Sequence, residues 1–105
     1  MLDVAILGQV AFGYSPFIDR NRAAPFYLSL HYTAPHWPWE APYHEGEFDL
    51  RPATTNGGSI ETFAAMMKAL DDGVGRVLDT LRRMGLDGNT LVVFTSDNGG
   101  ERYSY

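Results

Sequence analysis

Residues 60–96 read IETFAAMMKALDDGVGRVLDTLRRMGLDGNTLVVFTS, a long periodic segment followed by a turn and a short apolar run. In residues 60–84 the apolar side chains recur every three or four positions, which predicts one long amphipathic helix. Ser59 is a suitable N-cap for this helix, and Gly85 is a suitable residue just beyond its C-terminus. Residues 90–96, Thr-Leu-Val-Val-Phe-Thr-Ser, predict a buried strand after the helix.

Two glycines and two adjacent aspartates lie inside the predicted helix. Gly73 and Gly75 each cost a helix about 1 kcal/mol relative to alanine. We therefore expect a neighbouring element to approach the helix backbone closely at these positions. Asp71 and Asp72 project roughly 100° apart on a helix, so we interpret them as helix surface or a local hydrogen-bonded anchor rather than as a general acid-base pair.

A second strand is predicted upstream, at residues 26–30, where Phe-Tyr-Leu-Ser-Leu follows a proline. We expect it to be buried on both faces. Residues 32–59 then hold four of the six prolines and both tryptophans, which favours a packed loop over a site rather than disorder. Residues 1–22 give the weakest signal, and a poorly ordered terminus or an amphipathic turn fits them equally well.

The order strand, loop, helix, strand predicts an α/β chain built on a βαβ unit with parallel strands. In such sheets ligands bind beyond the carboxyl ends of the strands. That rule places His36, which follows the first strand, on the same edge as Asp97 and Asn98, which follow the second. A carboxylate beside an amide carbonyl offers two hard oxygen ligands, which suit Ca²⁺ or Mg²⁺.

Simpler interpretations stand beside these functional ones. Asp97-Asn98-Gly99-Gly100 also fits a tight hairpin turn, although residues 101–105 would make a poor following strand. His36 taken alone fits a loop histidine packed between prolines. His31 and His44 we interpret as structural.

Composition limits the classes of partner. The chain has 105 residues, enough for one small domain, and eight Lys plus Arg against thirteen Asp plus Glu give a net charge of -5. Without a basic cluster we expect no nucleic acid partner. No run approaches the roughly 20 apolar residues of a membrane span, and residues 1–12 lack the basic start of a signal peptide, which leaves the localisation open. The absence of cysteine excludes disulfides and thiolate sites within these residues.

Two longer segments resemble the sulfatases, the arylsulfatase-like members of the alkaline phosphatase-like superfamily. They are residues 25–40, PFYLSLHYTAPHWPWE, and residues 70–100, LDDGVGRVLDTLRRMGLDGNTLVVFTSDNGG. The specific features are A-P-H-x-P, then L-D-D-x-V-G-R-V-L, then V-V-F-T-S-D-N-G-G, in this order. The resemblance implies a mixed, mostly parallel sheet flanked by helices. It makes residues 15–105 a partial catalytic domain, whereas residues 1–14 match the family poorly.

The resemblance also implies roles for individual residues. His36 falls on the histidine that contacts the sulfate and protonates the leaving alcohol, and Asp97 and Asn98 fall on one pair of Ca²⁺ or Mg²⁺ ligands. The reaction would be hydrolysis of a sulfate ester, carried by a small molecule or a sulfated sugar. Trp37 and Trp39 would form a stacking wall for a sugar or aryl group, or equally the packed underside of the loop.

Several parts of the family's active site do not occur in these residues. The family uses a formylglycine made in a C/S-x-P-S-R segment, a second pair of aspartates at the metal and a lysine after D-N-G-G, and we find none of them. The resemblance therefore implies an internal fragment that is inactive by itself. Two alternatives remain: a non-catalytic metal-binding or interaction module, and a hydrolase of phosphodiesters or phosphonates. The oligomeric state is open.

Overall fold

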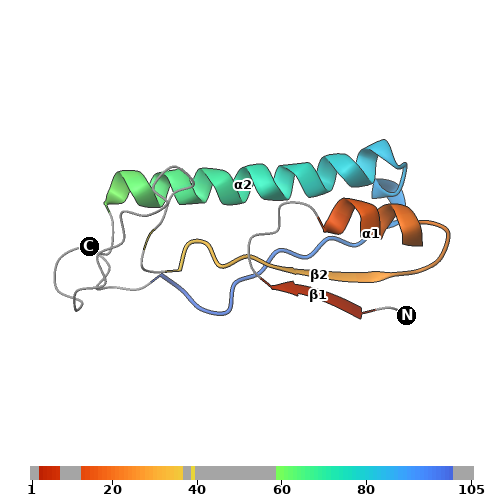
Figure 1. The fold of residues 1–105 in the computed structure, drawn as a ribbon, viewed down its shortest axis with the longest axis horizontal. Helices are drawn as coiled ribbons and strands as arrows, with labels where there is room; N and C mark the ends of the chain where they lie inside the picture. Colours follow the sequence, from red (N-terminus) through yellow and green to blue (C-terminus); the bar gives the residue numbers. More distant parts are fainter. Residues whose placement is uncertain (1–2, 8–12, 37–38, 40–58, 101–105) are drawn as a thin grey trace. The chain divides into compact units, whose positions relative to one another are not determined.

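A computed structural model describes residues 3–7, 13–36, 39 and 59–100 of the chain. The chain divides into two compact units, which are treated separately below. The first unit holds Met1–Thr33 and Asp72–Val93, and the second holds Ala34–Asp71 and Phe94–Tyr105. The elements, in chain order, are β1 (Asp3–Leu7), α1 (Tyr14–Asn21), β2 (Tyr27–His31), α2 (Ile60–Arg83) and the short 3-10 turn η1 (Asp87–Asn89) (Figure 1).

The first unit is built on a two-stranded parallel sheet. Strands β1 and β2 pair in register from Asp3 opposite Tyr27 to Leu7 opposite His31, and α1 connects them along the chain. Helix α1 and the C-terminal half of α2 lie on the same side of these strands (Figure 1). The core between the layers is the cluster Tyr14, Phe17, Ile18 and Leu81, with Phe26, Leu28, Leu30, Tyr32, Val77, Met84 and Leu86 packed against it.

Over residues 14–21, helix α1 replaces the poorly ordered terminus or amphipathic turn that the sequence suggested for residues 1–22. Tyr14, Phe17 and Ile18 share one helical face at spacings of three and four, and all three are buried. Pro16 is compatible with the helix because it lies in the first turn, where backbone N–H groups have no intrahelical partner. The Phe17 ring also packs edge-on against Phe26, with the ring centres 6.0 Å apart.

Helix α2 confirms the predicted amphipathic helix and its N-cap. The Ser59 hydroxyl oxygen accepts a hydrogen bond from the Thr62 N–H at 3.1 Å, so one of the otherwise unpaired N–H groups of the first turn is satisfied. The pKa of Glu61 is lowered by its own backbone N–H and by the Ser59 hydroxyl. The charged carboxylate therefore favours the helix above its ordinary pKa, and this contribution is lost as the pH falls through the lowered value.

The C-terminus of α2 ends in a Schellman motif. Gly85 has φ of 67°, and its N–H donates to the Arg82 carbonyl at 3.0 Å. The Leu86 N–H donates to the Leu81 carbonyl at 2.9 Å, and both leucine side chains belong to the core. These bonds pair two carbonyls that the helix leaves open and hold the chain where it turns away from α2.

We expect Gly85→Ala to destabilise the first unit by about 1 kcal/mol, since an L side chain strains the left-handed backbone at this position. Urea unfolding measures the change. Gly88→Ala is the matched control, because an added Cβ there meets nothing within 4 Å and the backbone is not left-handed. Equal effects of the two substitutions would contradict the assignment.

The two predicted strands fare differently. Residues 26–30 correspond to β2 with a shift of one residue, but the strand is not buried on both faces, because Tyr27 is 53% exposed. The strand predicted at residues 90–96 is wrong for this structure: residues 90–100 contain no strand, and Leu91, Val92, Val93 and Phe94 are 51% to 89% exposed. A buried strand needs neighbours that pair its backbone and cover both faces, and within the described residues β1 and β2 pair with each other and with no third strand. The parallel strands therefore flank α1 rather than α2.

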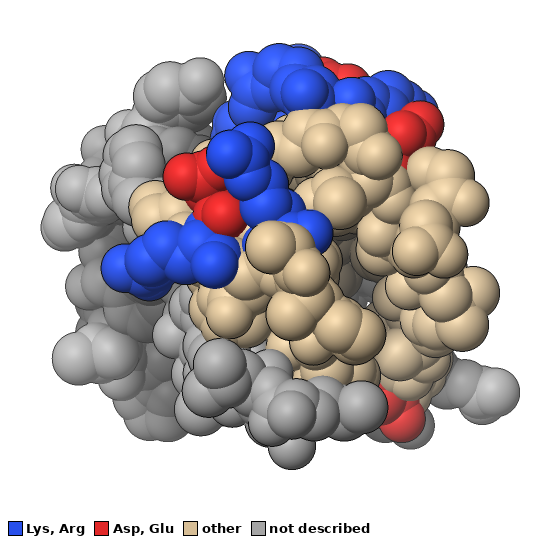
Figure 2. All heavy atoms as spheres, turned by 90° about the vertical axis from the view of Figure 1, so that its right-hand side faces the viewer, with Lys and Arg blue, Asp and Glu red and all other residues tan. Residues whose placement is uncertain are grey.

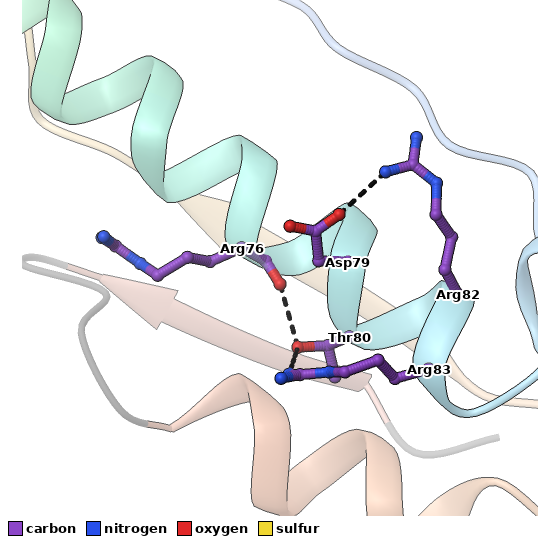
Figure 3. A network of polar contacts seen from close by, with 5 residues as sticks. All are labelled: Arg76, Asp79, Thr80, Arg82 and Arg83. Carbon is purple, nitrogen blue, oxygen red and sulfur yellow. Dashed lines mark hydrogen bonds and ion pairs between the residues drawn. The ribbon is translucent and has the colours of Figure 1, made fainter.

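Charged side chains of α2 pair locally at its C-terminal end (Figure 3). The buried Thr80 hydroxyl donates to the Arg76 carbonyl at 2.9 Å and accepts from the Arg83 guanidinium at 3.0 Å. Arg82 forms an exposed ion pair with Asp79 at 2.8 Å. In Figure 2 basic side chains likewise have acidic ones beside them. Exposed pairs of this type contribute about 0 to 1 kcal/mol each, so the apolar cluster dominates the stability of this unit.

Candidate active site

His36 lies five residues beyond the end of β2, in the second unit. Its side chain is exposed, so a ligand can reach the imidazole. Two local features of the sequence place His36: strand β2 ends at His31, and the ring of Pro35 restricts the backbone just before His36.

Asp97 and Asn98 lie in a compact bend of the second unit. The Ser96 hydroxyl donates to the Asn98 carbonyl at 2.7 Å, and the Asn98 N–H donates to the Asp97 carboxylate at 3.0 Å. The Asn98 side-chain amide donates to the Gly99 carbonyl at 2.7 Å, which directs its NH₂ group to the backbone. Both residues are exposed, and the bend fixes their side chains by local bonds.

The donor atoms of this bend match a hard cation in type but are too few to hold one. A carboxylate and an amide carbonyl are oxygen ligands of the class that Ca²⁺ and Mg²⁺ take, and such ions bind six or more. Among the residues that the structure describes, no three His, Asp or Glu side chains are grouped to hold a metal. Asp97 and Asn98 therefore fit part of a site, whose other ligands must come from elsewhere.

The two candidate segments belong to one compact unit. His36, Asp97 and Asn98 are all assigned to the second unit. The sequence argument for their meeting relied on a strand at residues 90–96, which is absent here. Their convergence on one site stays a prediction, and so do their individual roles.

The aromatic residues that were expected to line the site are only partly described. Trp39 is buried, and its indole lies against Phe63 of α2, with the ring centres 4.9 Å apart at a tilt of 52°. This contact matches the second of the two alternatives given for Trp39, the packed underside of the loop rather than a stacking wall for substrate. Trp37 lies outside the described residues, and binding of substrate by either tryptophan stays a prediction.

Comparison with known proteins decides the family. A family model described as Sulfatase matches residues 8–105, nearly the whole chain. This chain belongs to the sulfatase family. The resemblance read from residues 25–40 and 70–100 is thereby confirmed, and the match begins within the segment 1–14 that the sequence set apart. Membership implies the α/β fold of the alkaline phosphatase-like enzymes.

Several curated sulfatases are similar to the chain. They include the uncharacterized sulfatase YdeN of Escherichia coli, 36% identical over 78% of the chain and 15% of the relative. Steryl-sulfatase of mouse is 36% identical over 79% of the chain and 12% of the relative. N-acetylgalactosamine-6-sulfatase of pig is 36% identical over 79% and 15%. The chain thus spans less than a fifth of the length of these sulfatases, and no solved structure matches it significantly.

One residue of the first unit, four positions before His36 in the sequence, was not identified from the sequence. Tyr32 directly follows β2, and its hydroxyl oxygen is buried with no hydrogen-bond partner. The only sequence signal was indirect, because Gly73 suggested a close neighbour without naming it.

None of the helices that the structure describes in this sulfatase chain is both long and apolar enough to cross a membrane.

Proposed function

We propose that the protein carrying this chain is a sulfuric ester hydrolase that acts on a sulfated small molecule or a sulfated sugar. The family match over residues 8–105 carries the proposal, because it includes both segments that hold the candidate site residues. The names of the relatives, among them a steryl-sulfatase and an N-acetylgalactosamine-6-sulfatase, support both substrate classes. We also propose that the complete domain forms a mixed, mostly parallel sheet flanked by helices.

His36 would contact the sulfate and donate a proton to the oxygen of the departing alcohol. An imidazole suits this role because it holds and releases protons near neutral pH and donates hydrogen bonds to an anion. Its exposure in the second unit leaves it accessible to a substrate.

Asp97 and Asn98 would hold a Ca²⁺ or Mg²⁺ ion through their side-chain oxygens. Such an ion, when bound, offsets the negative charge on the sulfate oxygens. Within the bend, the hydrogen bond from the Asn98 backbone N–H to the Asp97 carboxylate orients that ligand. The Asn98 side-chain NH₂ donates a hydrogen bond to the Gly99 carbonyl, which leaves the side-chain oxygen for the ion. The nucleophile and the remaining metal ligands would come from other parts of the protein.

We expect hydrolysis of an aryl sulfate by the full-length protein to stop when EDTA removes divalent ions and to resume on addition of Ca²⁺ or Mg²⁺. Asp97→Ala should raise the ion concentration needed for half-maximal activity at least about tenfold, since even outer-sphere partners of metal ligands change affinity by 10- to 100-fold. Calorimetry with Ca²⁺ gives a reading that does not depend on turnover. Asp87→Ala, at an exposed aspartate of η1, is the control.

The 105-residue polypeptide expressed alone should show no turnover and should bind Ca²⁺ only weakly, because two oxygen ligands do not make a site. Micromolar binding of Ca²⁺ by this polypeptide would favour a self-sufficient metal-binding module instead. Activity of the full-length protein on a phosphodiester but not on a sulfate ester would contradict the proposed reaction.

A further inference from the structure

Tyr32 packs against a position of α2 that only glycine can occupy without displacing it. A Cβ built on Gly73 would lie 3.1 Å from both the Tyr32 Cε1 and hydroxyl oxygen atoms and 3.4 Å from Cζ. Two of these atoms are ring carbons and the third is the phenolic oxygen, and the side chain packs against the core cluster of α1 and α2. An added methyl group at Gly73 would therefore require the ring to shift by a few tenths of an ångström.

Gly75, two residues further along the same helix, shows that this approach is specific. A Cβ at Gly75 meets nothing within 4 Å. The sequence suggested close approach at both glycines, and the structure shows it only at Gly73. Glycine at position 73 costs the helix conformational stability, but it leaves room for the tyrosine ring to pack against the helix backbone.

The contact lies beside two of the three places where the chain passes between the compact units. Thr33, the next residue after Tyr32, is the last of the first unit before the chain enters the second. Asp72, the residue before Gly73, is the first after the chain returns. The Tyr32–Gly73 contact therefore ties both crossing points together within the first unit.

We propose that Tyr32, seated on Gly73, is a positioning residue that fixes the start of the segment carrying His36. The proposal rests on the proposed function, which gives His36 its role. The two residues are four positions apart in sequence, so the backbone between them spans at most roughly 14 Å. A shift of the anchor therefore passes to the imidazole, and misplacement by about 1 Å is enough to impair catalysis.

The ring rather than the hydroxyl performs this task. Burial, and to a lesser extent Tyr14, raises the pKa of the Tyr32 phenol, so it stays protonated at neutral pH. The buried hydroxyl has no hydrogen-bond partner, so it adds no hydrogen bond to the contact with Gly73. Tyr32→Phe should consequently keep the His36 segment in place, whereas Tyr32→Val should release it.

The test compares Gly73→Ala with Gly75→Ala in the full-length protein by hydrogen exchange and mass spectrometry. Gly73→Ala should speed amide exchange at Thr33, Ala34 and His36 about tenfold, which corresponds to the lower end of the free-energy cost of overpacking, with less change in α1. Gly75→Ala should leave this exchange unchanged or slow it. The double variant Tyr32→Val/Gly73→Ala should exchange no faster than Tyr32→Val alone, since the clash is gone.

Turnover of an aryl sulfate provides the second reading. Tyr32→Val should lower kcat about tenfold with little change in KM, and Tyr32→Phe should restore kcat. Equal exchange in the two alanine variants, or faster exchange spread evenly over α1, would overturn the positioning role. Faster amide exchange at residues 33–36 with an unchanged kcat would also overturn the positioning role. An inactive parent protein would refute the proposed function alone, and the exchange experiment would still decide whether Tyr32 holds the segment.

Discussion

Replacing His36 with alanine is expected to lower kcat for hydrolysis of an aryl sulfate by about 10²- to 10⁴-fold in the full-length protein. The leaving alcohol would then depart without a proton donor, and the sulfate would lose a hydrogen bond. KM should change less than kcat, because proton donation matters most in the transition state. Steady-state kinetics with an aryl sulfate measure the effect.

His31→Ala provides the matched control for His36→Ala. His31 is the last residue of β2 and is exposed. Its Nε2 atom forms a hydrogen bond of 2.9 Å with the Ser29 hydroxyl. It is thus engaged on the strand rather than in the segment beyond it. Its removal should change kcat by less than about threefold, as expected for a surface substitution. Full activity of His36→Ala, or equal losses in both variants, would contradict the role given to His36.

Ile18→Ala should produce the largest loss of stability, about 2 to 5 kcal/mol in the free energy of unfolding. Ile18 is 0% exposed in the core between α1 and α2, so the smaller side chain leaves a cavity as well as losing apolar contact. Urea unfolding of the chain measures the change.

Ile60→Ala makes the same chemical change at the start of α2, where the isoleucine is 60% exposed. It should alter stability by less than about 0.5 kcal/mol. A small effect of Ile18→Ala would mean that α1 does not pack as the structure has it.

Regular local patterns made α2 predictable. Its apolar stripe, Ser59 and Gly85 each act within a few residues, and the hydrogen bonds of both ends confirm them. Helix α1 has the same spacing in Tyr14, Phe17 and Ile18, but it is short and followed by polar residues. The pattern there covers too few turns to stand out, and packing on Leu81 rather than propensity stabilises the helix.

Non-local features could not be obtained in this way. Residues 90–96 have the composition of a buried strand, but composition does not supply the neighbouring strands that bury it. The presence of Gly73 inside the helix suggested that another element approaches closely, yet only the structure identifies Tyr32 as that neighbour. For the site, the residue types and the family followed from the sequence, whereas the distance between His36 and Asp97 depends on pairing beyond local patterns.

The exposed run Leu91 to Phe94 has a practical consequence for work with the short polypeptide. Four consecutive large apolar side chains that belong to no described strand are a template on which another copy can add as a strand. Lack of turnover by the polypeptide therefore has meaning only for material that light scattering shows to be monomeric. A solubilising fusion, or charged substitutions at Val92 and Phe94, would separate loss of chemistry from loss by aggregation.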